Sequence, residues 1–399
     1  MRPAAPSTPR RGTQTRMLRF LTAGESHGPQ LTVIVEGVPA GLPLSGPRDI
    51  DPDLRRRQWG YGRSKRQQLE SDAAEILSGV RGGRTLGSPI TLVVHNRVWD
   101  DWRKVMQVEA RGFQPKKVTR LRPGHADLAG VLKYGFDDVR NVLERASARE
   151  TAARVAAGAV AKTLLHRAGT AVHSYVRRIG EVEAPLVDAS AIDWSAVEAS
   201  PVRCPDPEAA ERMIAAVDAA ADAGDTVGGT AIVLATGVIP GLGSYVHWDR
   251  RLDGLLAQAL CSIQSVKGVD LGAEVASVPG SRLHDAPRWV EGEGFRHGSN
   301  NQGGLTGGVT DGEDVWAQVH FKPIATMRTP MRSADLATRQ EVSAHYERSD
   351  VCHVPAGAVV AEAMVAWVLA AALLEKFGGD SIDDLTGALR SYRRRLGRR

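Results

Sequence analysis

The stretch AGESHG at residues 23–28 places an acid, a hydroxyl and an imidazole side by side between two glycines. Glycine frees the backbone and has no side chain to bury, so such a stretch exposes polar groups instead of packing them. Imidazole is the side chain best suited to proton transfer at physiological pH. Ser26 and His27 are therefore candidates for chemistry, provided that the rest of the chain brings suitable groups beside them.

Six further polar connectors carry Arg, His, Ser, Asn or Asp side chains. Loops of this composition commonly hold binding residues. Taken singly, each has a structural explanation: a lone Arg is usually solvated, Ser147 fits a helix N-cap, and Gly-Gly pairs often form turns. Their co-occurrence in one chain favours a shared site. The connectors are RRRQWGYGRS (55–64), LRPGHADLAGVLKYG (121–135), RASARE (145–150), GFRHGSNNQGGLTGG (294–308), KPIATM (322–327) and ERSDVCHVP (347–355).

The charge pattern suits small anions more than nucleic acid. Arg greatly outnumbers Lys among the 51 basic residues, and the guanidinium group makes paired hydrogen bonds to phosphate and carboxylate. However, 46 acidic residues leave a net charge of only +5, and aromatic residues make up 5% of the chain. An Arg-rich nucleic-acid binder is the non-enzymatic alternative, but no stacking motif or recognition helix supports it.

The common cofactor fingerprints are missing from the sequence. There is no G-x-x-x-x-G-K-[ST] motif, and GEGFRHG (292–298) only approximates G-x-G-x-x-G. A phosphorylated ligand must then be held by Arg, Lys and loop N–H groups, and the start of a helix at Ser147 is one anion site. The eleven His and three Cys show no metal-binding spacing, and the odd Cys count favours a reducing cytoplasm.

Strand and helix patterns alternate irregularly, which favours an α+β fold. Runs rich in Val and Ile predict strands over 31–39, 88–96, 229–243 and 314–323. Apolar periodicity predicts helices over 206–225, 249–268 and 355–379, and one from a capping box at Ser147 and Glu150 to Gly169. We expect one compact domain at 17–387, a disordered basic leader at 1–16 and a basic tail at 388–399. The longest apolar stretch, 363–374, is too short to span a membrane.

An ordered set of motifs resembles the chorismate synthase family. It comprises AGESHG, RRRQWGYGR, RPGHAD, KYGFDDVR, RASARETAARVAAG, GDTVGG, GLGS, SIQSVKGV, NNQGGLTGG, KPIAT, RSDVC and EKFGGDS, from about Met17 to Ser381. The resemblance implies a sandwich of antiparallel sheets and helices, and a homotetramer. It also implies the 1,4-anti elimination of phosphate from 5-enolpyruvylshikimate 3-phosphate to give chorismate, with reduced FMN as a cofactor that undergoes no net oxidation. This reaction is the last common step of the shikimate pathway to aromatic amino acids.

The resemblance also implies roles for individual residues. His27 matches the general acid that protonates the departing phosphate, supported by Ser26. His125 matches the residue beside the reduced flavin, and Asp350 matches a carboxylate that relays a proton. Arg57 and Arg63 match positions that bind substrate or a nicotinamide phosphate. Positions that match FMN contacts are Arg145, Ala146, Ser147, Gln264, Ser265, Gly307, Lys322, Pro323, Ile324, Ala325, Thr326 and Arg348.

A conventional flavin oxidoreductase is a third interpretation, but it needs a hydride-donor site and no dinucleotide fingerprint is present. No additional reductase domain is evident in the sequence. We therefore expect FMN to be reduced by an external flavin reductase, with NADPH as an indirect reductant. The expected partner is a small-molecule substrate, without nucleic acid or membrane.

Overall fold

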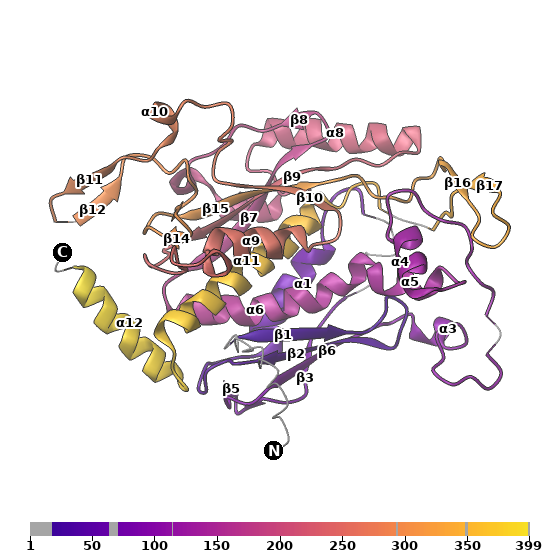
Figure 1. Ribbon diagram of the computed structural model, residues 1–399, viewed down its shortest axis with the longest axis horizontal. Coiled ribbons are helices and arrows are strands. Elements are labelled where there is room, and N and C mark those ends of the chain that lie inside the picture. The colour runs from indigo at the N-terminus through magenta and orange to yellow at the C-terminus, as the bar shows by residue number, and fades with distance from the viewer. Residues whose placement is uncertain (1–17, 64–70, 114, 293, 348–349, 398–399) are drawn as a thin grey trace, which may run out of the picture.

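The computed structural model describes residues 18–63, 71–113, 115–292, 294–347 and 350–397. The predicted leader at 1–16 lies outside them. The fold contains two antiparallel sheets with a layer of helices between them (Figure 1). This agrees with the predicted α+β sandwich. The arrangement follows from two kinds of apolar pattern, one in the strands and one in the two central helices.

The first sheet has the strand order β1 (Arg19–Ala23), β2 (Gln30–Glu36), β6 (Ile90–His95) and β3 (Glu75–Ile76), and all its pairs are antiparallel. Its central strand β2 alternates: Leu31, Val33 and Val35 are buried, whereas Ile34 is exposed. A period of two buries one face of a sheet and leaves the other to solvent. This sheet therefore covers the helical layer from one side only.

The second sheet has the order β10 (Val266–Leu271), β15 (Val315–Phe321), β9 (Gly229–Thr236), β7 (Ala171–Ile179) and β8 (Val182–Glu183). Six consecutive residues of β9 are buried, so both faces of this strand are covered. Helix α11 (Val354–Phe377) packs on one face of this sheet, and α8 (Pro207–Ala223) contacts β7 and β8. The strands predicted at 31–39, 88–96 and 314–323 are confirmed as β2, β6 and β15. The strand predicted at 229–243 is confirmed as β9 only as far as Thr236, because the chain turns at Gly237 with a left-handed φ of 67°.

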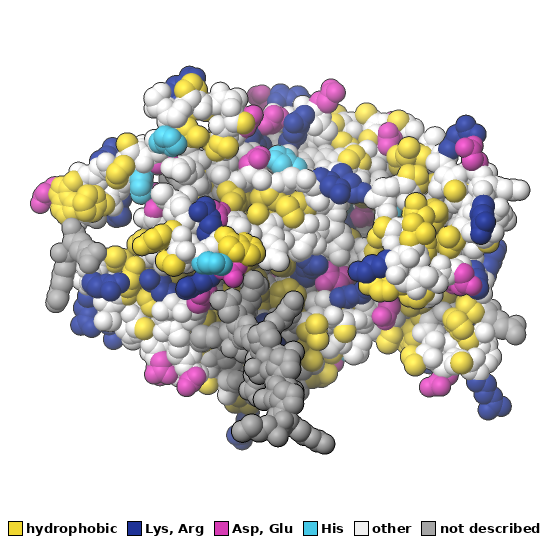
Figure 2. Space-filling view, in the orientation of Figure 1, with side chains coloured by type: hydrophobic (Ala, Val, Ile, Leu, Met, Phe, Trp, Pro, Cys, Tyr) yellow, Lys and Arg dark blue, Asp and Glu magenta, His cyan; other side chains and the backbone are white. Residues whose placement is uncertain are grey.

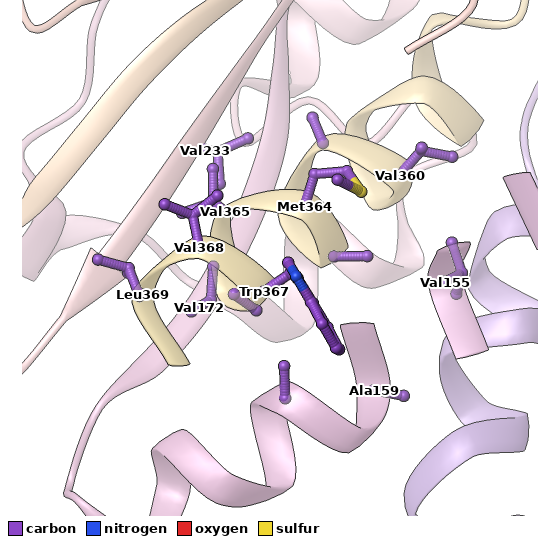
Figure 3. Close-up of a cluster of buried hydrophobic side chains, with 14 of the residues drawn as sticks. Val155, Ala159, Val172, Val233, Val360, Met364, Val365, Trp367, Val368 and Leu369 are labelled. Atoms are coloured by element: carbon purple, nitrogen blue, oxygen red, sulfur yellow. The ribbon is translucent and has the colours of Figure 1, made fainter. Parts of the chain in front are cut away.

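Two long helices form the central layer. Helix α11 (Val354–Phe377) contacts β7 and β9, and α6 (Thr151–Arg167) contacts β2 and β6. The two helices lie unusually close, since a Cβ on Gly158 would meet the Cβ of Ala363 at 2.4 Å. Figure 3 shows the aliphatic cluster around Trp367 where they meet. Helix α11 is long and apolar enough to cross a membrane, but 94% of its most apolar window is buried inside the protein.

Two predicted helices and one predicted domain boundary differ from the structure. Ser147 does cap a 3-10 turn (Ala148–Glu150), but the capping box does not form because the Glu150 side chain bonds Thr22 and Gln264 instead. The helix predicted at 249–268 ends earlier, as α9 (Leu252–Cys261), because Ser265 adopts a left-handed φ of 71° before β10. The predicted boundary at residue 387 falls inside α12 (Ile382–Leu396), where Leu389 is buried.

The remaining elements are short and lie around the core. Helices α1 (Asp51–Gln58), α4 (Asp127–Tyr134) and α5 (Arg140–Ala146) lie near the start of α6 (Figure 1). The others are α3 (Trp99–Trp102), α7 (Trp194–Ala199), α10 (Gly280–Leu283) and the strand pairs β4 (Val80–Arg81) with β5 (Arg84–Thr85), β11 (Pro287–Val290) with β12 (Gly294–His297), β13 (Leu305–Thr306) with β14 (Val309–Thr310), and β16 (Arg332–Ala334) with β17 (Glu341–Ser343).

Candidate active site

A cavity of about 650 Å³ lies where the two central helices begin. Ser147 to Arg149 and Thr151 line it from the start of α6, and His353, Ala356 and Gly357 line it from the start of α11. Helix N-termini carry partial positive charge, which favours bound anions. The volume of the cavity lies in the ordinary range for small-ligand sites. Six of the seven polar connectors reach this cavity, and the described part of 294–308 does not line it.

His27 is held rigidly on one wall of the cavity. Its Nδ1 lies 3.0 and 3.1 Å from the two carboxylate oxygens of Glu144, and its backbone N–H donates to the same group at 2.9 Å. The ring stacks on Trp102 at a centroid distance of 3.8 Å. The Glu144 carboxylate also accepts a hydrogen bond from Arg140 at 2.9 Å.

The position of Glu144 explains its charge state. Burial opposes its ionisation, but hydrogen bonds and positive charge from His27 and Arg140 prevail and lower the pKa of Glu144. An ionised carboxylate accepts a hydrogen bond from Nδ1–H. Glu144 therefore fixes the orientation of the His27 ring and leaves Nε2 for chemistry. Ser26 is also anchored here, because its N–H donates to the Glu144 carbonyl at 3.0 Å and its Oγ accepts from Ser147 at 3.3 Å.

His125 is held by a parallel arrangement elsewhere on the cavity wall. Its Nδ1 bonds the fully buried carboxylate of Asp127, and Arg122 grips that carboxylate through Nε at 2.9 Å and Nη2 at 3.0 Å. Burial disfavours the ionised form, yet the bonds from His125 and Arg122 lower the pKa of Asp127. Each imidazole is therefore hydrogen-bonded to a buried carboxylate, and that carboxylate in turn accepts a hydrogen bond from an arginine.

Several cations line the same cavity. Arg57 is 4% exposed and donates to Thr151 Oγ1 at 2.8 Å and to the Ala148 carbonyl at 3.1 Å. Arg149 binds Asp72 at 2.6 Å, and Arg63 pairs with Asp350 at 2.9 Å. Lys322 donates to the Gly124 carbonyl, beside His125 in sequence. The cavity can therefore receive a ligand that carries several negative charges.

Most of the predicted positions lie together here. Besides the residues above, the predicted positions that line the cavity are Ala146, Gln264, Ser265, Pro323, Ile324, Ala325 and Thr326. Arg145 instead lines a smaller hollow together with Phe20 and Thr22, and it donates to the Thr22 and Gly24 carbonyls. Gly307 lies in the β13–β14 turn near Tyr245, away from the cavity lining. Arg348 lies outside the described residues.

Sequence reasoning missed several cavity residues. Arg122 and Trp102 line the cavity, while Glu144 and Asp127 lie outside its lining and hydrogen-bond the imidazoles of His27 and His125. Glu144 is 117 residues from His27, so their contact depends on the fold. Arg122 and Asp127 belong to the connector at 121–135, but the sequence assigned them no role. A third imidazole, His353, also lines the cavity, and its Nε2 lies 2.5 Å from Ser265 Oγ. Burial first, and then the charges of Arg63 and Lys322, lower the pKa of His353 to about 4. It is therefore neutral at physiological pH.

Comparison with known proteins identifies the family. The chorismate synthase family model matches residues 18–374. The chain belongs to the chorismate synthase family. It is 56% identical to the chorismate synthase of Moorella thermoacetica, an alignment that covers 95% of this chain and 99% of the relative. It is 52% identical to that of Symbiobacterium thermophilum, with 96% and 100% covered.

A solved structure supports the fold as well. A crystal structure of a chorismate synthase superposes with a TM-score of 0.77 at 42% identity, covering 96% of this chain and 99% of that one. The chain is accordingly a carbon–oxygen lyase that acts on a phosphate ester. It eliminates phosphate from 5-enolpyruvylshikimate 3-phosphate to give chorismate, the reaction of this family.

Proposed function

We propose that this chorismate synthase carries out its reaction in the cavity between His27 and His125, with reduced FMN and the substrate bound together. The observation that carries the proposal is that both imidazoles line one cavity together with Arg57, Arg63 and Lys322. The substrate bears a phosphate and two carboxylates, and FMN bears another phosphate. Such a load of negative charge requires several fixed cations, which arginine supplies with defined geometry.

His27 is proposed as the general acid for the departing phosphate. Glu144 and Trp102 hold its ring from two sides, so Nε2 keeps one direction toward the cavity. The proton that it gives to the phosphate neutralises charge as the carbon–oxygen bond breaks. Ser26 supports this wall through its bond from Ser147.

His125 and Asp350 are proposed to manage protons on the cofactor side. The carboxylate of Asp127 would hold the proton of His125 at Nδ1, which leaves Nε2, 3.4 Å from Arg122 Nη2, as the ring nitrogen proposed to exchange a proton. Asp350 pairs with Arg63 at 2.9 Å on the cavity wall. Arg57 and Arg63 are proposed to bind anionic groups of the substrate or of a nicotinamide phosphate.

The chemistry of the lining fits FMN. Gln264 Oε1 is buried beside the cavity without a hydrogen-bond partner among the described residues, so a polar group of a ligand can satisfy it. The 322–326 run supplies Lys322 for phosphate, and Ala146, Ser147 and Ser265 complete the proposed cradle. Arg145, Gly307 and Arg348 are retained as proposed FMN contacts, although Arg145 and Gly307 do not line the cavity of one protomer. Reduced FMN supplies electron density to the substrate and recovers it, which keeps the net reaction redox neutral.

The proposed assembly is a homotetramer. Exposed aromatic residues that would suit subunit contacts include Trp248 and, on the β11–β12 hairpin, Trp289 and Phe295. This hairpin projects from the body of the molecule, and Figure 2 shows its apolar surface at the left edge. On the same face Lys and Arg are interspersed with Asp and Glu, which does not favour a nucleic-acid surface. We further propose a cytoplasmic location, FMN reduction by an external reductase, and NADPH as its indirect electron source.

An anaerobic assay tests the proposal. The protein is supplied with chemically reduced FMN and the enolpyruvyl substrate, and phosphate release is followed together with the ultraviolet band of the new diene. We expect phosphate and diene in equal amounts, without net flavin oxidation. Stoichiometric flavin oxidation would contradict the proposal and favour a conventional oxidoreductase. Turnover in air with only NADPH and FMN would contradict the external reductase.

A further inference from the structure

One carboxylate lies between the two imidazole arrangements. Glu347 has its Oε2 3.8 Å from Arg122 Nη1 and its Oε1 3.9 Å from Arg140 Nη2. Arg122 grips the carboxylate that binds His125, and Arg140 grips the carboxylate that binds His27. A continuous series of charged groups therefore runs from one imidazole to the other, with Glu347 at its midpoint.

The contacts on the His27 side strengthen this link. The Arg140 guanidinium also lies over the Trp102 ring at 5.0 Å, and Trp102 stacks on His27. The Nε atom of Arg140 is buried without a hydrogen-bond partner among the described residues. Arg140 thus has two ways to affect His27, one through Glu144 and one through Trp102, and its orientation depends on the acids around it.

Glu347 carries a negative charge that both arginines share. The hydrogen bond from His345 at 3.3 Å lowers the pKa of Glu347 to about 2, and Arg122 and Arg140 act in the same direction against burial. Without the Glu347 charge, both guanidinium groups would interact more strongly with the carboxylates of Asp127 and Glu144. Those carboxylates would then hold the Nδ1 atoms of the two imidazoles less well.

We infer that Glu347 is a positioning residue that couples His27 and His125 through Arg122 and Arg140. The inference rests on the roles proposed above for the two imidazoles. It also predicts an unusual combination of effects, because Glu347 lines the cavity and partly cancels its positive charge. Its neutralisation should tighten the binding of anions while it slows the reaction.

The test compares Glu347→Gln with wild type and with Glu341→Gln, a matched control whose carboxylate pairs with Arg332 on the surface. Calorimetry with inorganic phosphate on the protein without flavin measures anion binding, and anaerobic phosphate release measures turnover. For Glu347→Gln we expect about threefold tighter phosphate binding and a kcat about tenfold lower. Glu341→Gln should match wild type in both.

Glutamine has the size of glutamate, so a purely steric role would leave Glu347→Gln with wild-type phosphate affinity and kcat. That result would overturn the inference, as would weaker phosphate binding together with lower kcat. Glu347→Asp keeps the charge and serves if the glutamine variant does not fold; it should bind phosphate within about twofold of wild type and keep a higher kcat than Glu347→Gln. Phosphate binding weakened by clearly more than about twofold in Glu347→Asp would also overturn it. A failure of the proposed function itself would appear separately, as absent turnover in wild type.

Discussion

Two neighbouring arginines on α1 have opposite surroundings. Arg56 enters a closed group of charges, where it lies 2.7 Å from the carboxylates of Asp53, Glu198 and Glu362. Lys162 joins the same group, at 2.9 Å from Asp53 and 2.6 Å from Glu362. Every one of these charges finds its counter-charge within the protein.

Arg57 points the other way, into the cavity. It donates to two neutral acceptors, Thr151 Oγ1 and the Ala148 carbonyl, and its ion pair with Asp72 is longer at 3.4 Å. The difference shows how one residue type serves two purposes. Where the protein supplies the counter-charge, arginine stabilises the packing of helices; where it lines the cavity, we propose that it serves ligand recognition. Substitutions in the two regions should therefore separate stability from activity.

The largest effect on stability is expected in the closed group of charges formed by Arg56, Lys162, Asp53, Glu198 and Glu362. Glu362→Ala removes the more deeply buried of the two carboxylates that Arg56 and Lys162 share, and it should lower the free energy of unfolding by about 3–5 kcal/mol. Urea denaturation measures the change. Glu375→Ala on the same helix is the control, because Glu375 is an exposed partner of Arg250 and should cost less than about 0.5 kcal/mol. Equal losses for the two variants would refute the contrast.

The cavity should respond in activity instead. His27→Ala is expected to lower kcat by about 10²–10³-fold, because the departing phosphate loses its proton donor. FMN affinity should stay within about twofold, since the resemblance assigns FMN contacts to other residues. Anaerobic phosphate release and a flavin titration measure the two quantities. His247→Ala, at an exposed histidine that pairs with Asp249, is the control. Loss of FMN binding in His27→Ala would contradict its assigned role.

A smaller effect is expected at Lys322. Burial and then the nearby charge of Lys267 lower the pKa of Lys322, so an anionic ligand would relieve an unfavourable environment. Lys322→Ala should weaken FMN binding about tenfold. Lys117→Ala removes an exposed lysine that pairs with Asp137 and should leave the affinity unchanged. Unchanged affinity in Lys322→Ala would show that other groups hold the phosphate.

The smallest effect concerns pH. Burial opposes ionisation of Glu198, but hydrogen bonds from Arg203 and Arg56 prevail and lower its pKa from 4.5 to about 2. The folded pKa lies below the unfolded one, so this stabilisation is present above pH 4.5 and is lost as pH falls toward 2. Glu198→Gln should therefore lose less stability than wild type on acidification through this range. Urea midpoints between pH 5 and 3 measure this, and parallel curves would contradict it.

The sequence predicted the fold where the pattern is local. Apolar patterns predicted the strands β2, β6, β9 and β15 and the helices α8 and α11. Capping residues helped as well, such as Asp206 and Gly224 at the two ends of α8. The errors arose where tertiary contacts competed with local ones. Glu150 binds groups from distant segments instead of completing its capping box, and α9 ends early because the chain must turn at Ser265 to reach the cavity.

The site shows the same division. Of the seven connectors predicted to share a site, six line the cavity, because their residue types reveal the chemistry, and the described part of 294–308 does not. The motifs did not predict that Glu144 bonds His27, since Glu144 lies 117 residues away and the pairing exists only after α5 packs beside the 23–28 loop. Asp127 lies two residues from His125 within the motif RPGHAD, but the motif did not indicate their bond. Nor did they predict that Arg145 and Gly307 lie apart from the cavity of one protomer.

A crystal structure with FMN and the enolpyruvyl substrate bound tests the central claim most directly. The account predicts that both molecules occupy the cavity between His27 and His125, with their phosphates against cations of the lining and Glu347 between Arg122 and Arg140. Ligands bound elsewhere, such as in the hollow beside Arg145, with this cavity filled only by water, would contradict it.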